Sequence, residues 1–390
     1  MKIGHKFKNK EIILFILFLT LNLQLVSLAG LSETNDFNGK VKLYIIVTLI
    51  VSYLAFVKRR IVDFNFFLVV IYLFFVILSS IVFMILYNFN FLYLNYIFCL
   101  VLFLISFRLG EIIDYKKIVN VIKSSVILIY LIVLFKLMVN FDKVIQFLSA
   151  PYGHPDIPVI YGGGVNLEAT YIALSSVFFF KDKKYYLLIL FSIVLSSIYA
   201  SRVGLILSLL SFGFYSFSMY RSKNEKRIIS IVFSIFVFFG ISFFIQNYEE
   251  IYVLNRISQV GTDAGSQGRF NLWQNVLDAS IDNLLLGYGP GNAVYALEQF
   301  YNYSFIEDNL HNIYLQNLLD FGIFGLFFFL IVVFAISITN LKQRFKNMFG
   351  VWLLLFFIAG LIQFRGANAL MYFMLGLYIS SYSKNNINCE

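Results

Sequence analysis

The feature that most constrains this chain is a series of apolar runs, each close to the length that crosses a lipid bilayer. A helix that spans the hydrocarbon core needs about 20 apolar residues. Such runs recur along the whole chain and predict an all-α polytopic membrane protein of about twelve transmembrane helices. The expected spans are residues 11–30, 41–57, 64–87, 91–107, 118–139, 164–180, 185–200, 203–220, 228–245, 311–339, 349–364 and 366–383.

Composition agrees with this fold class. The chain is 60% hydrophobic and 13% charged, whereas a soluble domain is about one quarter charged. Its many Phe residues are tolerated in a bilayer core, and Tyr suits the headgroup level. The lysine-rich N-terminus resembles the start of a signal peptide, but no small-residue cleavage site follows and further spans come after it. We therefore interpret residues 11–30 as a retained first helix.

The distribution of basic residues predicts the topology. Positive charge collects on the cytoplasmic side of a membrane protein. If the N-terminus is cytoplasmic, 21 of the 30 basic residues fall on that side, in the tails and in every second connection. We therefore expect a multi-pass membrane protein with both termini in the cytoplasm. The net charge of +9 is then a topology signal, and nucleic acid is excluded as its explanation.

The connections predict one integral membrane domain, residues 1–390, with two long segments on the outer side. Residues 140–163 hold three prolines and end in consecutive glycines, which predicts an irregular, partly rigid loop. Residues 246–310 form the large extracytoplasmic loop. These two segments are the places where polar chemistry outside the membrane is expected.

Within the large loop, residues 269–285 have the periodicity of an amphipathic helix that lies along the outer membrane surface or caps the bundle. Residues 287–291, rich in glycine, end it. Asn309 is the expected N-cap of the next helix, which would carry His311 and Asn312. The predicted apolar stripe consists of Trp273, Val276, Leu277, Ile281, Leu284 and Leu285.

Arginines on the outer side are candidate ligands for an anionic substrate. A guanidinium group keeps its charge and presents a planar fork of donors that suits phosphate. The alternative for each arginine is a headgroup anchor or a structural salt bridge. The candidates are Arg202, Arg256, Arg269 and Arg365. Lysines near the outer helix ends are expected to snorkel to the interface; these are Lys40, Lys42, Lys136 and Lys143.

Three further residues are candidates for chemistry. His311, at the predicted outer start of a helix, is a candidate general base near neutral pH or a hydrogen-bonded interfacial histidine. Glu168 lies near the outer end of a span, where a carboxylate faces a polar cavity or a partner such as an arginine. His154 is expected to be an ordinary loop residue. Motifs for phosphate-binding loops, metal ligands and serine nucleophiles are absent from the sequence, so we predict no metal site and no cofactor.

The order of several short motifs resembles the bacterial O-antigen polymerase and O-antigen ligase superfamily. The resemblance covers roughly residues 160–330. It rests on these residues in order: Asn166 with Glu168-Ala169, Ser201-Arg202, Gly268-Arg269, Trp273, Gly287-Tyr288-Gly289, His311-Asn312-x-Tyr314-Leu315 and Asp320-Phe321-Gly322-Ile323-Phe324-Gly325.

This resemblance implies a GT-C-like, metal-independent glycosyltransferase of the bacterial cytoplasmic (inner) membrane, with an active site on the periplasmic or extracellular side. Its donor would be an oligosaccharide linked to undecaprenyl pyrophosphate. Arg202 and Arg269, with Arg365 as a weaker candidate, would hold the departing pyrophosphate. His311 would accept the proton of the attacking hydroxyl. Membrane lipid, a flippase and a chain-length regulator are the implied partners. Further substrate-binding candidates are Asn166, Glu168, Asn312 and Tyr314.

The sequence leaves the acceptor open. A polymerase transfers the glycan to another lipid-linked repeat unit, and a ligase transfers it to lipid A core. Frequent Phe, Tyr, Ile, Asn and Lys favour a polymerase, because these residues suggest the AT-rich genes typical of surface-polysaccharide clusters. A polysaccharide flippase or secondary transporter is the alternative from another class. Such proteins often show internal repeats and polar residues at mid-membrane, which this chain lacks. The ordered motifs also disfavour a cell-wall glycan polymerase.

Overall fold

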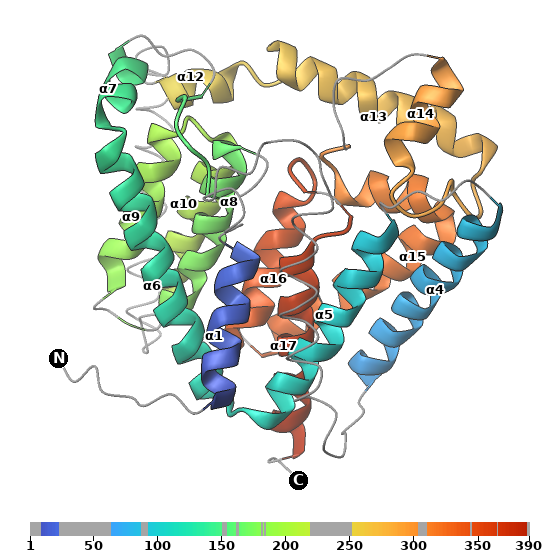
Figure 1. The fold of residues 1–390 in the computed structure, drawn as a ribbon, viewed down its shortest axis with the longest axis horizontal. Coiled ribbons are helices and arrows are strands. Elements are labelled where there is room, and N and C mark those ends of the chain that lie inside the picture. The colour runs from blue at the N-terminus through green and yellow to red at the C-terminus, as the bar shows by residue number, and fades with distance from the viewer. Residues whose placement is uncertain are drawn as a thin grey trace. The chain divides into compact units, whose positions relative to one another are not determined.

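The computed structural model describes residues 9–22, 64–86, 93–149, 154–160, 164–180, 182, 185–218, 252–302, 310–343, 345–364 and 366–387 (Figure 1). All regular secondary structure in these ranges is helical. The chain divides into two compact units. Unit 1 comprises residues 1–21, 34–121 and 268–390, and unit 2 comprises residues 22–33 and 122–267.

Unit 1 has a core of closely packed apolar helices. Helices α5 and α17 pack along much of their length. Gly376 permits this approach, because a Cβ atom there would lie 2.5 Å from the carbonyl oxygen of Phe103. The helices of this unit are α1 (Asn9–Asn22), α4 (Phe64–Leu86), α5 (Tyr93–Ile112), α14 (Ala293–Tyr301), α15 (Ile313–Lys342), α16 (Met348–Ala359), α17 (Ala369–Ile387) and most of α13 (Ala264–Asp282).

Unit 2 is built around α8, α9 and α10, which pack against one another. Gly204 lies where they meet, since a Cβ atom there would lie 2.8 Å from that of Ala169 and 2.9 Å from the Ser196 hydroxyl. The elements of this unit are α6 (Tyr115–Val139, from residue 122), α7 (Phe141–Ser149), α8 (Val165–Ser175), the 3₁₀ helix η1 (Ser176–Phe179), α9 (Tyr186–Ile198), α10 (Arg202–Ser218) and α12 (Tyr252–Ser258).

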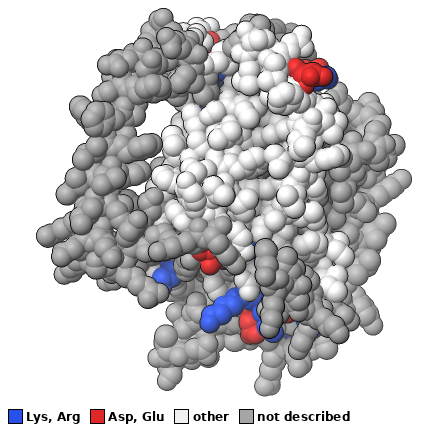
Figure 2. Space-filling model, turned by 90° about the vertical axis from the view of Figure 1, so that its left-hand side faces the viewer, with Lys and Arg blue, Asp and Glu red and all other residues white. Residues whose placement is uncertain are grey.

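The predicted all-helical class is confirmed for the described residues. Ten of the twelve expected spans coincide with helices, and the other two, 41–57 and 228–245, lie outside the described ranges. Among the described helices, α6 and α15 are long and apolar enough to cross a membrane. Figure 2 shows one face on which most of the described side chains are uncharged and the few Lys, Arg, Asp and Glu side chains form small groups. These features are those of a helical membrane protein.

The two segments expected on the outer side contain more helix than the sequence predicts. Residues 141–149 form α7, so the expectation of an irregular loop over 140–163 is wrong for its first part. The reason is that the prolines begin at Pro151, and a proline restricts itself and the residue before it. Two short helices, α12 and α14, also flank the predicted amphipathic helix of the large loop.

A kink in α15 fixes the large loop to the membrane helices of unit 1. Gly322 interrupts the helix with φ 67° and ψ −167°, a backbone conformation essentially restricted to glycine. In a regular helix the Ile323 amide would donate to the Leu319 carbonyl. Here Ile323 donates to the carbonyl of Leu284 (2.7 Å), and Leu319 accepts from the amide of Tyr288 (2.8 Å). The loop thus replaces the helical hydrogen bond that the kink breaks.

The neighbouring residues reinforce this junction. The Gly289 amide donates to the Asp320 carbonyl (2.9 Å). The fully buried Asp320 carboxylate accepts from the Tyr96 hydroxyl (2.8 Å) and from the Ala293 amide (3.1 Å), so it also binds the N-terminus of α14. Gly287, with φ 70°, allows the close approach, because a Cβ atom there would lie 2.5 Å from the Gly322 nitrogen. We call this set of contacts the loop junction.

Replacement of Gly322 by alanine tests the loop junction. Gly322→Ala is expected to destabilise the protein by on the order of 3 kcal/mol, since the backbone conformation is costly for alanine and its Cβ atom would lie 2.3 Å from the Leu285 carbonyl oxygen. The measurement is thermal unfolding of the purified protein in detergent.

Gly268→Ala is the matched control. A Cβ atom at Gly268, inside α13, meets nothing within 4 Å, and alanine favours helix by about 1 kcal/mol over glycine. This variant should be as stable as the wild type or slightly more stable. Equal melting temperatures for the two variants would contradict the structural role of Gly322.

Candidate functional site

The predicted site residues fall in both units. Unit 1 contains Arg269, His311, Asn312 and Tyr314. Unit 2 contains Arg202, Asn166 and Glu168. Arg365 lies outside the described residues. The surroundings of these residues are described for each unit by itself.

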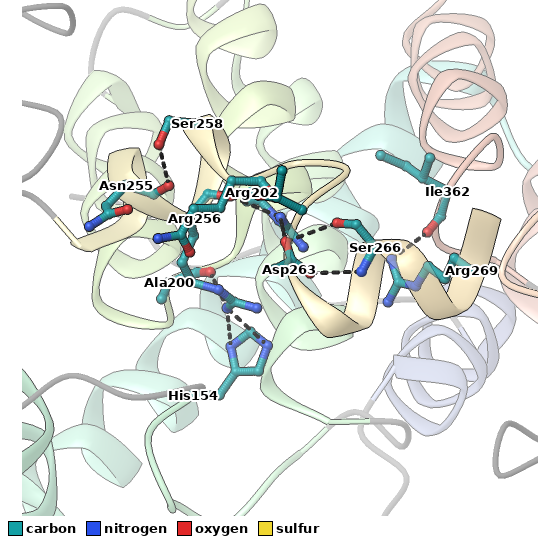
Figure 3. A network of polar contacts seen from close by, with 12 residues as sticks. His154, Ala200, Arg202, Asn255, Arg256, Ser258, Asp263, Ser266, Arg269 and Ile362 are labelled. Carbon is teal, nitrogen blue, oxygen red and sulfur yellow. Dashed lines mark hydrogen bonds and ion pairs between the residues drawn. The ribbon is translucent and has the colours of Figure 1, made fainter. Parts of the chain in front are cut away.

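In unit 1, three hydrogen bonds bring the start of α13, the segment at His311 and the end of α16 together. Arg269 Nη1 donates to the carbonyl of Ile362 (3.1 Å; Figure 3). One turn further along α13, Trp273 Nε1 donates to the carbonyl of Leu310 (2.8 Å), directly before His311. The Ile313 amide donates to the carbonyl of Gly360 (2.8 Å). Arg269 and His311 therefore lie in one neighbourhood, which we call the unit 1 site.

His311 occupies a special backbone position. Its φ of 50° lies in the left-handed region, which is uncommon for residues other than glycine. The next residue, Asn312, is the N-cap of α15, and its side-chain oxygen accepts from the amides of Tyr314 and Leu315. The prediction that Asn309 caps this helix is therefore wrong, since α15 begins at Ile313 and His311 precedes it. A half-buried imidazole is thus held just outside a capped helix end.

The other two candidates of unit 1 have clear structural contacts. Asn312 uses its side-chain oxygen as the cap, and its side chain is buried. The Tyr314 hydroxyl donates to the carbonyl of Phe357 (3.0 Å) in α16. Both residues fix the first turn of α15 and thereby the backbone of His311.

In unit 2, Arg202 binds the backbone of Arg256, and Arg256 binds the backbone just before Arg202. Arg202 Nη1 donates to the carbonyl of Arg256 (2.8 Å) and forms a salt bridge with Asp263. Arg256 Nη1 donates in turn to the carbonyl of Ala200 (2.8 Å), two residues before Arg202. This reciprocal pair, which we call the arginine clamp, fixes α12 to the turn between α9 and α10 (Figure 3).

The turn that the arginine clamp holds has an unusual backbone. Ala200 has a φ of 50°, a conformation that costs a residue with a Cβ atom on the order of 1 kcal/mol. The adjacent Ser201 hydroxyl bonds the side-chain oxygen of Asn166, so this predicted substrate-binding residue also supports the turn. The contacts on both sides keep Arg202 at the first position of α10.

His154 completes the cluster. Its Nδ1 lies 2.8 Å from the carbonyl oxygen of Tyr199, which only accepts hydrogen bonds, so this ring nitrogen is the donor. Arg256 Nη1 lies 3.3 Å from Nδ1 and 3.2 Å from Nε2 of the ring. His154 thus contacts the arginine clamp, whereas the sequence predicted an ordinary loop residue.

Asp263 stays ionised in this cluster. Burial by itself would raise the pKa of Asp263, but hydrogen bonds from Arg202 and Ser266 and the charge of Arg202 outweigh it and lower the pKa to about 2. The stability that Asp263 contributes is therefore present above its unfolded value of 3.8 and is lost only as the pH falls through about 2. Burial and the charge of Arg202 lower the pKa of Arg256.

Glu168 lies in a buried ion pair rather than beside an arginine. The carboxylate is fully buried, forms a salt bridge with Lys136, and accepts from the Tyr199 hydroxyl and the Ile160 amide (both 2.7 Å). The expectation that Lys136 snorkels is wrong, because the buried carboxylate draws the ammonium group inward. All of these contacts are internal, so they indicate that Glu168 joins α6, α8, α9 and residues 154–160.

Sequence reasoning missed Asp263 and did not predict the contacts that Arg256 and His154 make. Arg256 and Asp263 lie 54 to 61 residues from their partners in unit 2, and no periodicity links such positions. The one available signal was the position of Arg256 in the sequence, because it is an arginine in a segment predicted to lie on the outer side, where few basic residues are expected.

The fold and these sites define a helical membrane protein with arginine and histidine side chains grouped at helix ends. A comparison with protein families identifies the class further, because the family described as O-antigen ligase matches residues 185–330. This match confirms the resemblance to the O-antigen polymerase and ligase superfamily, and it includes Arg202, Arg269 and His311. A search of curated proteins found no match. Members of that family are glycosyltransferase-like enzymes, and the family suggests a role in polysaccharide biosynthesis.

Single and double substitutions of Lys136 and Glu168 test the structural role of this ion pair. Lys136→Met and Glu168→Gln, each alone, should destabilise the protein by about 3 kcal/mol, because removal of one partner leaves the other buried and uncompensated. The double variant should recover much of this loss. The measurement is thermal unfolding in detergent for the four proteins.

An activity assay of the double variant distinguishes a structural role of the pair from substrate binding by Glu168. If the pair only supports the fold, the double variant should keep its activity in membranes. A double variant that is stable but inactive would show that Glu168 contacts the substrate and would contradict our assignment.

Proposed function

We propose that this protein is a glycosyltransferase that polymerises undecaprenyl-pyrophosphate-linked oligosaccharide repeat units into O-antigen or capsular polysaccharide. The reaction would take place at the outer face of the bacterial cytoplasmic membrane, with both termini in the cytoplasm. The family match supports the reaction class. The observation that carries the proposal is the unit 1 site, where α13 positions Arg269 beside the segment of His311.

The chemistry follows from the charges that develop. An acceptor hydroxyl attacks the anomeric carbon of the donor, the bond to the pyrophosphate oxygen breaks, and negative charge grows on the departing diphosphate. Arg269 would stabilise this charge with its fixed donors. His311 would take the proton of the hydroxyl as it attacks. In this proposal one polyprenyl pyrophosphate is released for each glycosidic bond formed, and no metal ion takes part.

Arg202 is the second proposed pyrophosphate ligand, and Arg365 is a third. Arg202 binds Arg256 and Asp263 through Nη1, so we assign the other edge of its guanidinium group to the substrate. Asn166, Glu168, Asn312 and Tyr314 are assigned to positioning. Asn166 supports the turn before Arg202, Glu168 pairs with Lys136, Asn312 caps α15 and Tyr314 ties that helix to α16.

A ligase that transfers the glycan to lipid A core is the second candidate. The description of the matching family favours it, whereas the residue usage that suggests an AT-rich gene favours the polymerase. Both enzymes need the same donor and the same leaving group, so they predict the same roles for Arg269 and His311. A flippase or transporter would need neither a general base nor a leaving-group ligand.

Complementation of two bacterial strains tests the proposal. In a strain that lacks its polymerase, the wild-type chain should restore long surface glycans, and in a ligase-deficient strain it should not attach glycan to lipid A core. Arg269→Ala, Arg269→Lys and His311→Ala should each abolish chain growth, because lysine lacks the planar fork of donors. The measurement is the glycan length distribution on gels.

Asn271→Ala is the matched control, since Asn271 lies on the exposed polar side of α13, two residues from Arg269. It should leave chain growth unchanged. All variants should be present in the membrane at wild-type amounts. Normal glycan lengths in Arg269→Ala or His311→Ala would remove the catalytic assignment, and attachment to lipid A core would establish the ligase.

A further inference from the structure

Helix α13 has two apolar sides, and one of them packs against other described residues of unit 1. The packed side contains Leu272, Val276 and Ala279, which are buried in a cluster with α14 and the start of α15. The other apolar side is exposed. It contains Phe270 (47% exposed), Leu277 (52%) and Ile281 (70%). The predicted stripe thus divides, with Val276 turned inward and Leu277 and Ile281 turned outward.

The exposed apolar side forms a continuous line. Residues 270, 277, 281 and 284 are spaced by seven, four and three positions, which places them on one face of a helix and its C-terminal extension. Asn271, Gln274, Asp278 and Asp282 form a separate exposed polar side. The helix therefore has one side toward the protein, one exposed apolar side and one exposed polar side. That division is typical of a helix at a membrane surface.

The loop junction connects the exposed apolar side to a membrane-crossing helix. Leu284, Leu285 and Leu286 are all exposed, and the Leu284 carbonyl accepts from the Ile323 amide of α15. Ile323, Phe324 and Phe327, in the next turns of α15, are exposed as well. Since α15 is long and apolar enough to cross a membrane, its exposed side contacts acyl chains. The apolar side of α13 is continuous with that lipid-facing surface.

We propose that α13 is an interfacial helix whose exposed apolar side, Phe270, Leu277, Ile281, Leu284 and Leu285, inserts among the lipid acyl chains at the edge of the bilayer. Insertion is driven by burial of these side chains. The exposed polar side carries Asp278 and Asp282, so attraction to anionic headgroups does not drive it. The loop junction holds the C-terminal end of α13 at the membrane, which leaves little entropy to be lost on insertion.

An interfacial α13 would also explain how Arg269 reaches its substrate, and this consequence rests on the proposed function. Arg269 lies on the packed side of the same helix and donates to Ile362. A helix axis at the boundary between headgroups and acyl chains places this guanidinium near the depth of lipid phosphates. The diphosphate of a lipid-linked donor lies at that depth too. The interfacial helix would thus set the level at which Arg269 meets its substrate.

Fluorescence quenching in vesicles tests the inference. Single cysteines replace Ile281, on the apolar side, or Asp278, its matched control on the polar side, in a background in which Cys389→Ser leaves the buried Cys99. Each cysteine carries an NBD fluorophore, and the protein is reconstituted in phosphatidylcholine vesicles with or without nitroxide-labelled acyl chains. We expect several-fold stronger quenching for Ile281→Cys than for Asp278→Cys.

Equal quenching at the two positions would overturn the inference. So would an Ile281→Cys variant that reacts slowly with the reagent but is not quenched, because another protein segment would then cover this side. The experiment needs no donor and no turnover. A failed glycosyltransferase assignment would therefore leave the quenching result unchanged, and a failed membrane insertion would leave the complementation result unchanged.

Discussion

The arrangement of unit 1 depends on one exchange of backbone hydrogen bonds. Where α15 bends at Gly322, the helix loses the bond between Ile323 and Leu319, and the large loop supplies Leu284 and Tyr288 in their place. An unpaired amide or carbonyl inside a membrane protein is costly. The loop is therefore bound to the helix by groups that have few other partners. Two glycines with positive φ make the approach possible.

The unit 1 site follows from this constraint. The loop junction fixes the C-terminal end of α13, and Trp273 fixes the helix beside Leu310. Arg269 and the segment of His311 are thus held in place by side-chain hydrogen bonds to backbone carbonyls. Such preorganisation suits an enzyme whose task is to stabilise a leaving diphosphate. In unit 2 the arginine clamp is also fixed by bonds to the backbone. Arg202 binds a carbonyl of α12, and Arg256 binds the Ala200 carbonyl in the turn before α10.

Much of the fold and part of the site could be predicted from the sequence. Apolar runs gave the helix positions because lipid imposes one length and one composition on a span. Arg202, Arg269 and His311 became candidates because few charged residues are predicted on the outer side and because their order resembles a family. The Lys136–Glu168 pair and the arginine clamp were not predictable, since each joins residues far apart in the sequence through side-chain geometry. The cap at Asn312 was missed because Asn309 has the same capping chemistry, and only the backbone at His311 decides between them.

The central claim is that Arg269 and His311 act on a lipid-linked diphosphate donor. The most direct measurement uses purified protein in vesicles with an oligosaccharide linked to undecaprenyl pyrophosphate, in the presence of a metal chelator. Released polyprenyl pyrophosphate and glycan length are quantified together. We predict one released diphosphate for each repeat unit added, and neither product from Arg269→Ala or His311→Ala. An intact donor with the wild-type protein, or equal release by the two variants, would contradict the account.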